Sequence, residues 1–493
     1  SYDSSYYHDG YYHDYYDHSY DDGHYDDSGQ SSGAPSQKWG GMAEIDGVLY
    51  AAPFDHFSML MWEPKNNNQP PAIIPLDMNG TDHFVTDIHS GDKWIPTTAL
   101  DDVVYMAPFN ASGMLSYHHG EQRFTEYAMN IPQTYYDGRL TASSDNFAGY
   151  YMGIAIVGSS HIVMTPFCAE TVLLFDISAQ QISHSVLPER LRRTVVTGDN
   201  TQKFGQAVAV GNTVYASPFN SDFLFTFEHD EHFNGNPFDS DDRTGGINVA
   251  SALKDYPYNK AGKWFGIAHY GNKIYCVPAS HHSMLIYDLD VSSGHRFREV
   301  AISGLPEIPQ QAQGIPLYTT ASMIDSTIYA FPGASLFGMF MFETISETSN
   351  VRSLDTSFEK GYVGSVAVKE HHAIYGAPFT ASEILVYAVQ NPYAEPRAEE
   401  PYNYSASNCS TFAPEPVQRD RGEVRSEVFR CRTNFVDENG DETDEPLCIH
   451  AAGVCNDFLN CPDGSDEIGI GDTVRISEDG SISTSSSSSS SFD

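Results

Sequence analysis

Basic residues are scarce in this chain. Its 493 residues include 26 Lys and Arg against 66 Asp and Glu, which gives a formal net charge of −40. Binding to phosphates requires a basic face, so we expect no nucleic-acid partner. The charge balance instead favours divalent cations, basic partners or a place in a hydrated matrix.

Long apolar runs are also missing. The sequence contains no stretch of about 18 apolar residues, so we expect no membrane span. It has no Gly-rich phosphate loop either. The first residue is Ser1 rather than Met, and we expect a mature chain from which a signal peptide has been removed.

Cysteine is sparse and unevenly placed. Seven Cys residues are present, and five of them lie between residues 409 and 461. This skew predicts an oxidising compartment and a small disulfide-stabilised module beside a larger domain that needs no disulfides. Four N-x-Ser/Thr sequons support an extracellular location and are predicted glycosylation sites: Asn79, Asn110, Asn403 and Asn408.

Both ends of the chain have a biased composition. Residues 1–33 contain nine Tyr, eight Asp and four His but no Lys or Arg, and such a segment cannot bury a core. Two interpretations stay open for it. It is either an adhesive or cross-linking arm, in which Tyr stacks or couples oxidatively and Asp and His bind cations, or a solvated tail. The run from Ser485 to Ser491 is typical of a flexible or O-glycosylated stalk.

The middle of the chain is repetitive. A six-residue pattern ending in Pro recurs seven times, with successive Pro residues 55, 58, 52, 60, 54 and 46 positions apart. A Tyr stands three residues before the Pro in six of the copies. A period of about fifty residues made of short strands predicts a β-propeller with one copy per blade. The copies are Val48–Pro53, Val103–Pro108, His161–Pro166, Thr213–Pro218, Lys273–Pro278, Thr327–Pro332 and Ala373–Pro378.

Each copy is the centre of a longer unit. An aromatic segment such as Lys263-Trp264 precedes it, and an apolar run such as 284–287 follows. The segments 72–76 and 297–302 are candidates for a fourth strand. Since Pro cannot donate to a sheet ladder, each repeated Pro should end a strand. We expect residues that recur in every blade to pack the blades, whereas a functional site should break the repeat.

These units resemble those of the kelch-like and quinoprotein-like propellers, and the resemblance covers residues 34–391. It implies an all-β fold with a seven-bladed β-propeller and carries no activity with it. After the seventh copy, residues 391–396 offer no obvious outer strand. We therefore expect the last blade to be completed by N-terminal sequence or by a neighbouring subunit.

Three stretches around the clustered cysteines form one pattern: Phe429-Arg430-Cys431, Cys448-Ile449-His450, and the run from Cys455 through Cys461 to Asp463-Gly464-Ser465-Asp466-Glu467. They resemble an LDL-receptor class A repeat. This resemblance implies a Ca²⁺ cage, which holds together a small module with little core. The implied ligands are the side chains of Asn456, Asn460, Asp466 and Glu467 and the carbonyl oxygens of Gly453 and Phe458.

The chain departs from that family in two ways. Asn456 and Asn460 stand where Asp is usual, so two negative charges are missing and the Ca²⁺ affinity should fall. The sixth cysteine is absent, and Ile470 lies about where it should be. The family pairing implies two disulfides and one unpaired thiol: Cys409–Cys448, Cys431–Cys461 and Cys455. An odd thiol in a secreted protein invites an intermolecular bond, and a degenerate module that folds without metal is the alternative.

The histidine motifs indicate no active site. Three His pairs lie in turn-rich stretches without metal-ligand spacing: His118-His119, His281-His282 and His371-His372. The acidic and histidine-containing run 228–232 fits a solvated loop better than a cation site. We therefore predict no catalytic or cofactor-binding residues other than the calcium ligands, and no enzyme activity.

The predicted organisation has four parts: a tail (1–33), a seven-bladed propeller (34–395), an LDL-receptor class A-like module (396–470) and a Ser-rich tail (471–493). The biased tails, the sequons and the odd cysteine favour a secreted structural protein. Such a protein would self-associate through propeller faces and tails into a filament, coat or matrix. A secreted adhesion module that recognises a protein or glycan is the alternative, and a propeller oxidoreductase or hydrolase is the third interpretation.

Overall fold

The structure is a computed structural model of the chain. It describes residues 37–65, 71–76, 86, 91–129, 149–192, 202–229, 244–250, 262–290, 296–303, 305, 316–333, 337–354, 361–381 and 383–389, and the backbone of 428–436, 442–450, 473–476 and 482–485. The chain divides into two units. The first contains residues 1–386 and 473–484, and the second contains residues 387–472 and 485–493.

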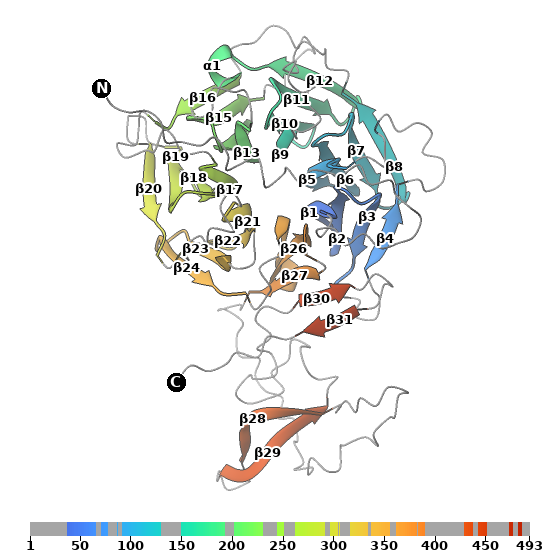
Figure 1. Cartoon of the computed structure of the whole chain (residues 1–493), viewed down its shortest axis with the longest axis vertical. Helices are drawn as coiled ribbons and strands as arrows, with labels where there is room; N and C mark the ends of the chain where they lie inside the picture. Colours follow the sequence, from blue (N-terminus) through green and yellow to red (C-terminus); the bar gives the residue numbers. More distant parts are fainter. Residues whose placement is uncertain are drawn as a thin grey trace, which may run out of the picture. The chain divides into compact units, whose positions relative to one another are not determined.

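The first unit is a seven-bladed β-propeller, as the repeat predicts. Seven antiparallel sheets, each built from strands in sequence order, stand around one axis in a closed ring (Figure 1). The first strand of each sheet lies nearest the axis, and the later strands lie progressively further out (Figure 1). The repeated unit of the sequence is therefore one blade.

Strand boundaries follow the repeat closely. The innermost strands begin at an aromatic residue: β1 (Trp39–Ile45), β5 (Trp94–Leu100), β9 (Tyr151–Val157), β13 (Phe204–Val210), β17 (Trp264–Tyr270), β21 (Tyr318–Ile324) and β25 (Tyr362–Val368). The second strands are the seven copies: β2 (Val48–Pro53), β6 (Val103–Pro108), β10 (His161–Pro166), β14 (Thr213–Pro218), β18 (Lys273–Pro278), β22 (Thr327–Pro332) and β26 (Ala373–Pro378). All seven end at the repeated Pro, which confirms that prediction.

Third and outer strands complete the blades. The third strands are β3 (Ser58–Trp62), β7 (Gly113–His118), β11 (Thr171–Asp176), β15 (Phe223–Glu228), β19 (Ser283–Asp288), β23 (Met339–Glu343) and β27 (Glu383–Ala388). The outer strands of blades 1 to 6 are β4 (Ala72–Pro75), β8 (Arg123–Ala128), β12 (Gln181–Val186), β16 (Thr244–Asn248), β20 (Phe297–Ala301) and β24 (Thr348–Arg352). Both fourth-strand candidates from the sequence, β4 and β20, are confirmed. Short helices lie at Glu189–Arg192 (α1) and Lys369–His371 (η4).

The repeated Tyr packs one blade against the next. In five junctions its ring contacts an aromatic ring on the third strand of the following blade, with centroids 5.7 to 6.3 Å apart. These pairs are Tyr50–Tyr117, Tyr105–Phe175, Tyr215–Tyr287, Tyr275–Phe342 and Tyr375–Trp62. Aromatic pairs of this kind add about 0.5–1.5 kcal/mol beyond the burial of their area. The recurring Tyr is thus a packing residue, as predicted.

Blade 7 corrects the prediction about ring closure. Its fourth strand is β30 (Thr473–Ile476), which pairs antiparallel with β27 in the register Ile384↔Val474. A fifth strand, β31 (Ile482–Ser485), follows it in the same sheet. The donor is therefore C-terminal sequence of the same chain, and neither the N-terminal sequence nor a neighbouring subunit.

The physical reason for this error is distance along the chain. β27 ends at Ala388 and β30 begins at Thr473, so 84 residues (389–472) separate two strands that are neighbours in the sheet. The alternating Thr-Val-Arg-Ile sequence suits a strand, but no local feature of it indicates which strand it pairs with. β30 and β31 both lie within residues 471–493, for which the sequence predicted a Ser-rich tail.

The second unit contains one described hairpin. β28 (Val428–Val436) pairs antiparallel with β29 (Glu442–His450), and Arg430 lies opposite Cys448. In the sequence, the acidic insertion 437–441 separates these two strands.

Candidate functional site

One end of the innermost strands carries a ring of hydrogen bonds between blades. At six junctions, the residue just before the innermost strand donates its backbone N–H to the carbonyl of the residue that follows the repeated Pro in the preceding blade. The bonds are 2.6 to 3.1 Å long at six junctions: Lys38→Phe379, Lys93→Phe54, Tyr150→Phe109, Lys203→Phe167, Lys263→Phe219 and Leu317→Ala279. The blades are therefore joined around the axis by backbone bonds as well as by packing.

Buried lysine side chains reinforce three of these junctions. Lys93, Lys203 and Lys263 are each 0% exposed. Their ammonium groups donate to backbone carbonyls two residues after the Pro of the preceding blade, at 3.2, 2.8 and 3.2 Å. The acceptors are the carbonyls of Asp55, Cys168 and Asn220 respectively. A buried ammonium is tolerated only when it is hydrogen-bonded in this way.

The side chains of those three acceptor residues also take part. The Asp55 carboxylate, the Cys168 thiol and the Asn220 amide each accept the backbone N–H of the residue before the lysine, at 2.9, 3.3 and 2.6 Å. The donors Asp92, Gln202 and Gly262 all have left-handed backbone, with φ of 58°, 54° and 63°. The same local geometry is therefore built from three different side-chain types.

Two charged groups in these junctions have displaced pKa values. Burial, and then the charge of Asp55, raise the pKa of Asp92 to about 8, although Lys93 acts in the opposite direction. Burial lowers the pKa of Lys263 to about 8, and Asp222, whose carboxylate lies 3.5 Å from its ammonium, opposes this. Such values are typical of catalytic groups, but both groups are buried in contacts between blades.

A belt of phenylalanines surrounds the axis next to this ring of bonds. In five blades the residue after the repeated Pro is Phe: Phe54, Phe109, Phe167, Phe219 and Phe379. All five are at most 2% exposed, and they form one apolar cluster with Phe265, Ile95, Met152 and Val363. Neighbouring rings lie 5.1 to 6.2 Å apart at four junctions. We call this cluster the phenylalanine belt.

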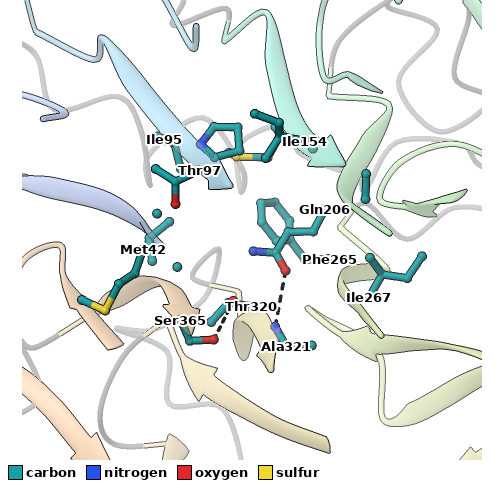
Figure 2. A pocket seen from close by; sticks show the side chains of 17 residues that line it. Met42, Ile95, Thr97, Ile154, Gln206, Phe265, Ile267, Thr320, Ala321 and Ser365 are labelled. Atoms are coloured by element: carbon teal, nitrogen blue, oxygen red, sulfur yellow. Dashed lines mark hydrogen bonds between the residues drawn. The ribbon is translucent and has the colours of Figure 1, made fainter. Parts of the chain in front are cut away.

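A cavity of about 150 Å³ lies on the axis beside the belt. All seven innermost strands line it, and Ile95, Met152, Phe265 and Val363 belong to both the cavity wall and the belt. Figure 2 shows the lining side chains converging from the surrounding strands. None of the 17 lining residues is charged. The cavity is therefore a neutral site. We call the apolar surface that it shares with the belt, formed by Ile95, Met152, Phe265 and Val363, the floor of the cavity.

Polar side chains of the cavity wall come from four blades spread around the axis, namely blades 2, 4, 6 and 7. The Gln206 amide oxygen accepts the backbone N–H of Ala321 at 3.3 Å. The Ser365 hydroxyl lies 3.0 Å from the hydroxyl of Thr320 and 2.7 Å from that of Ser322. The Thr97 hydroxyl oxygen is buried and has no hydrogen-bond partner among the described residues. The cavity with these polar groups is the candidate functional site of the propeller.

Most of the site residues predicted from sequence lie outside the described residues. This applies to the implied calcium ligands Asn456, Asn460, Asp466 and Glu467, to Cys409, Cys455 and Cys461, and to the sequons Asn79, Asn403 and Asn408. Cys431 and Cys448 lie on β28 and β29, where only the backbone is described. The remaining sequon, Asn110, is half-buried, and its backbone N–H donates to the Asp92 carbonyl at 2.9 Å.

The histidine motifs lie in structural contacts of the propeller. The His119 ring bonds the Tyr50 hydroxyl of the preceding blade. His281 packs on Trp264 with ring centroids 4.7 Å apart, and His371 lies 3.0 Å from the Tyr375 hydroxyl. His229, from the run 228–232, is 3% exposed and packs against His161 at 4.3 Å. The prediction of a solvated loop is therefore wrong for His229, because this ring fills the junction between blades 3 and 4.

Two negative findings apply to the described part of the chain. There, no group of three or more His, Cys, Asp or Glu side chains is placed to hold a metal ion. No helix within the same residues is long and apolar enough to cross a membrane.

Sequence reasoning missed the cavity residues, although a signal for them was present. Two residues after the aromatic start of the innermost strand, four blades have Gly: Gly41, Gly153, Gly266 and Gly364. The other three have Pro96, Gln206 and Thr320. Pro96, Gln206 and Thr320 thus all break the repeat, which is the signature that a functional position was expected to show.

Comparison with solved structures finds similarity at low sequence identity. A selenomethionine-substituted virginiamycin B lyase from Staphylococcus aureus is 9% identical, with a TM-score of 0.48 over 70% of this chain and 92% of that chain. A streptogramin B lyase is 10% identical, with a TM-score of 0.48 over 70% and 92%. The computationally designed Ika8 protein is 10% identical, with a TM-score of 0.39 over 73% and 85%. Nothing about the activity of this chain follows from similarity at this level. No protein-family model and no curated protein matches the chain.

Proposed function

We propose that this protein is a secreted structural subunit that self-associates into an extracellular filament, coat or matrix. The observation that carries the proposal is the way the propeller uses its buried polar groups. The side chains of Lys93, Lys203 and Lys263 connect neighbouring blades. Backbone hydrogen bonds connect neighbouring blades at six junctions around the axis. A ring held in this way is a rigid building block, and the proposal assigns the contacts with other copies to its faces and to the tails.

The composition of the chain supports the same function. A net charge of −40 keeps individual copies soluble and favours assembly that depends on cations. The Tyr-, Asp- and His-rich residues 1–33 supply stacking and cation-binding groups. The odd Cys455 supplies a thiol for an intermolecular disulfide. Assembly through cations and tails would leave the propeller itself unchanged.

Calcium has a defined place in this proposal. Asn456, Asn460, Asp466 and Glu467 would hold one Ca²⁺ in the LDL-receptor class A-like module, which in turn would order the contacts between copies. The support for this step comes from the sequence pattern alone. Because assembly would then require Ca²⁺, a chelator should prevent it.

The test is negative-stain electron microscopy of the full chain, secreted from a eukaryotic host, at rising concentration with and without a Ca²⁺ chelator. We expect ordered filaments or sheets that disappear with chelator. The variant Asp466→Asn should assemble poorly, and its matched control Asp444→Asn, in the acidic insertion, should assemble normally. Single rings under all conditions would refute the structural function.

Recognition of a small ligand is a second candidate function, and one observation favours it. The axial cavity combines a neutral wall, an apolar floor and a buried hydroxyl without a partner among the described residues. Such a combination is typical of binding sites for small molecules.

A further inference from the structure

We propose that the axial cavity binds a neutral pyranose, such as the terminal sugar of a glycan. This inference rests on the second candidate function, recognition of a small ligand, and does not depend on the structural one. It starts from the size of the cavity, about 150 Å³. An engineered protein cavity of about the same volume holds one benzene molecule. The space therefore suits a single six-membered ring.

The wall excludes charged ligands. The 17 lining residues come from all seven innermost strands and include no Asp, Glu, Lys, Arg or His. A charged ligand would lose its hydration and find no opposite charge, which is strongly unfavourable. The ligand is therefore neutral.

The polar groups of the wall exclude a purely apolar ring. The Thr97 hydroxyl is buried and has no partner among the described residues, so it lacks a bond that a ligand hydroxyl could supply. The bond from the Ala321 N–H fixes the Gln206 oxygen outside the centre of the cavity, and Figure 2 shows the amide reaching in from β13. The amide nitrogen is thus oriented to donate to a ligand oxygen. An apolar ring would leave both groups unpaired, which costs affinity.

The surface next to the phenylalanine belt is apolar. Phe265, Ile95, Met152 and Val363 form the floor that the cavity shares with the phenylalanine belt. A pyranose has the matching chemistry, because C–H groups cover its faces and hydroxyls project around its edge. Gln206 and Ser365 are only half-buried, so the cavity is accessible to solvent beside them.

Two residues provide the direct test. Gln206→Met keeps the length of the side chain and removes the amide, and Thr97→Val keeps its shape and removes the hydroxyl. Their controls are Gln181→Met and Thr348→Val, which change the same residue types at exposed positions of outer strands. Circular dichroism would verify that each variant folds.

The experiment measures binding to the full chain by saturation-transfer difference NMR. The probes are methyl pyranosides of glucose, galactose, mannose and N-acetylglucosamine. At least one should bind with a dissociation constant of about 1 mM, as expected for a ligand of this size. Gln206→Met should weaken that binding about tenfold, and the controls should leave it unchanged. The charged analogue methyl glucuronide should not bind.

Thr97→Val gives a second readout that a structural role would not produce. Removing a buried hydroxyl without a partner should raise the melting temperature of the free protein while it weakens sugar binding. Three results would overturn the proposal: no pyranoside binding, binding that both variants leave unchanged, or binding of the glucuronide as tight as that of the glucoside. A cavity that holds only water would give the first of these.

Discussion

The ammonium of Lys203 donates a hydrogen bond of 2.8 Å to the backbone carbonyl of Cys168 and thereby joins blade 4 to blade 3. Lys203 is fully buried, and the Cys168 thiol beside it accepts the backbone N–H of Gln202. Burial raises the pKa of that thiol, although Lys203 acts against the shift. Cys168 is therefore a structural thiol whose backbone and side chain both serve the junction.

Lys203→Met should destabilise the propeller by about 1–3 kcal/mol. The substitution keeps the length of the side chain and leaves the buried Cys168 carbonyl without its partner, which costs the desolvation of that group. Urea-induced unfolding followed by tryptophan fluorescence measures the change. Lys65→Met, at an exposed position, should have no effect beyond about 0.5 kcal/mol. A more stable Lys203→Met protein would mean that the cost of burying the ammonium exceeds the value of its bond.

Asp92 should make stability fall as the pH rises from about 4 to about 8. Its pKa in the folded protein is raised to about 8 by burial and by Asp55, with Lys93 opposing, whereas the unfolded value is about 4. Between these pH values the folded state keeps a proton that the unfolded state has released. The contribution of Asp92 is therefore complete below about pH 4 and is lost as the pH approaches 8.

Asp92→Asn tests this dependence. The difference in unfolding free energy between wild type and variant should change across this window by at most about 1.4 kcal/mol per pH unit, in the direction that favours the variant at high pH. Asn also tolerates the left-handed backbone at this position. Asp325→Asn is the matched control, because Asp325 has a similar φ of 53° but an exposed side chain. Equal pH profiles for wild type and Asp92→Asn would contradict the prediction.

Gly364→Ala should disrupt the junction that closes the ring. A Cβ at Gly364 would lie 2.2 Å from the Cα of Gly41, so blade 7 and blade 1 would have to move apart. We expect a loss of more than about 4 kcal/mol, the range of severe packing defects. Gly271→Ala isolates the steric effect, since Gly271 also has positive φ but has open space around it. The control should lose about 1–2 kcal/mol, and similar losses for both variants in urea unfolding would refute the close contact.

Removing residues 473–493 should open blade 7. Without β30, the buried strand residues Glu383, Ile384 and Leu385 would lose their neighbour in the sheet, and β27 would become an unprotected edge. We expect a lower melting temperature and association of the truncated chain, measured by calorimetry and light scattering. Removal of residues 486–493 alone leaves both strands in place and should change neither quantity. A full-length melting temperature after the larger truncation would show that β30 does not contribute to the ring.

Much of the fold could be predicted because its information is local. The repeated Pro ends all seven second strands since it cannot continue a ladder, and the repeated Tyr packs between blades because each copy occupies the same place. The candidate site was far less predictable. Gln206 breaks the Gly repeat, yet its role in a binding site depends on Thr97 and Ser365, which come from two other blades.

The sequence by itself determined the number of blades, their strands and the residues that pack them, because periodicity and strand chemistry are properties of neighbouring residues. The tertiary structure decided three further features. It paired β27 with β30 across 84 intervening residues, it buried Lys93, Lys203 and Lys263 between blades, and it gathered the polar wall of the axial cavity. Each of these depends on groups from separate parts of the sequence that become neighbours only when the chain folds, so no local pattern could specify them.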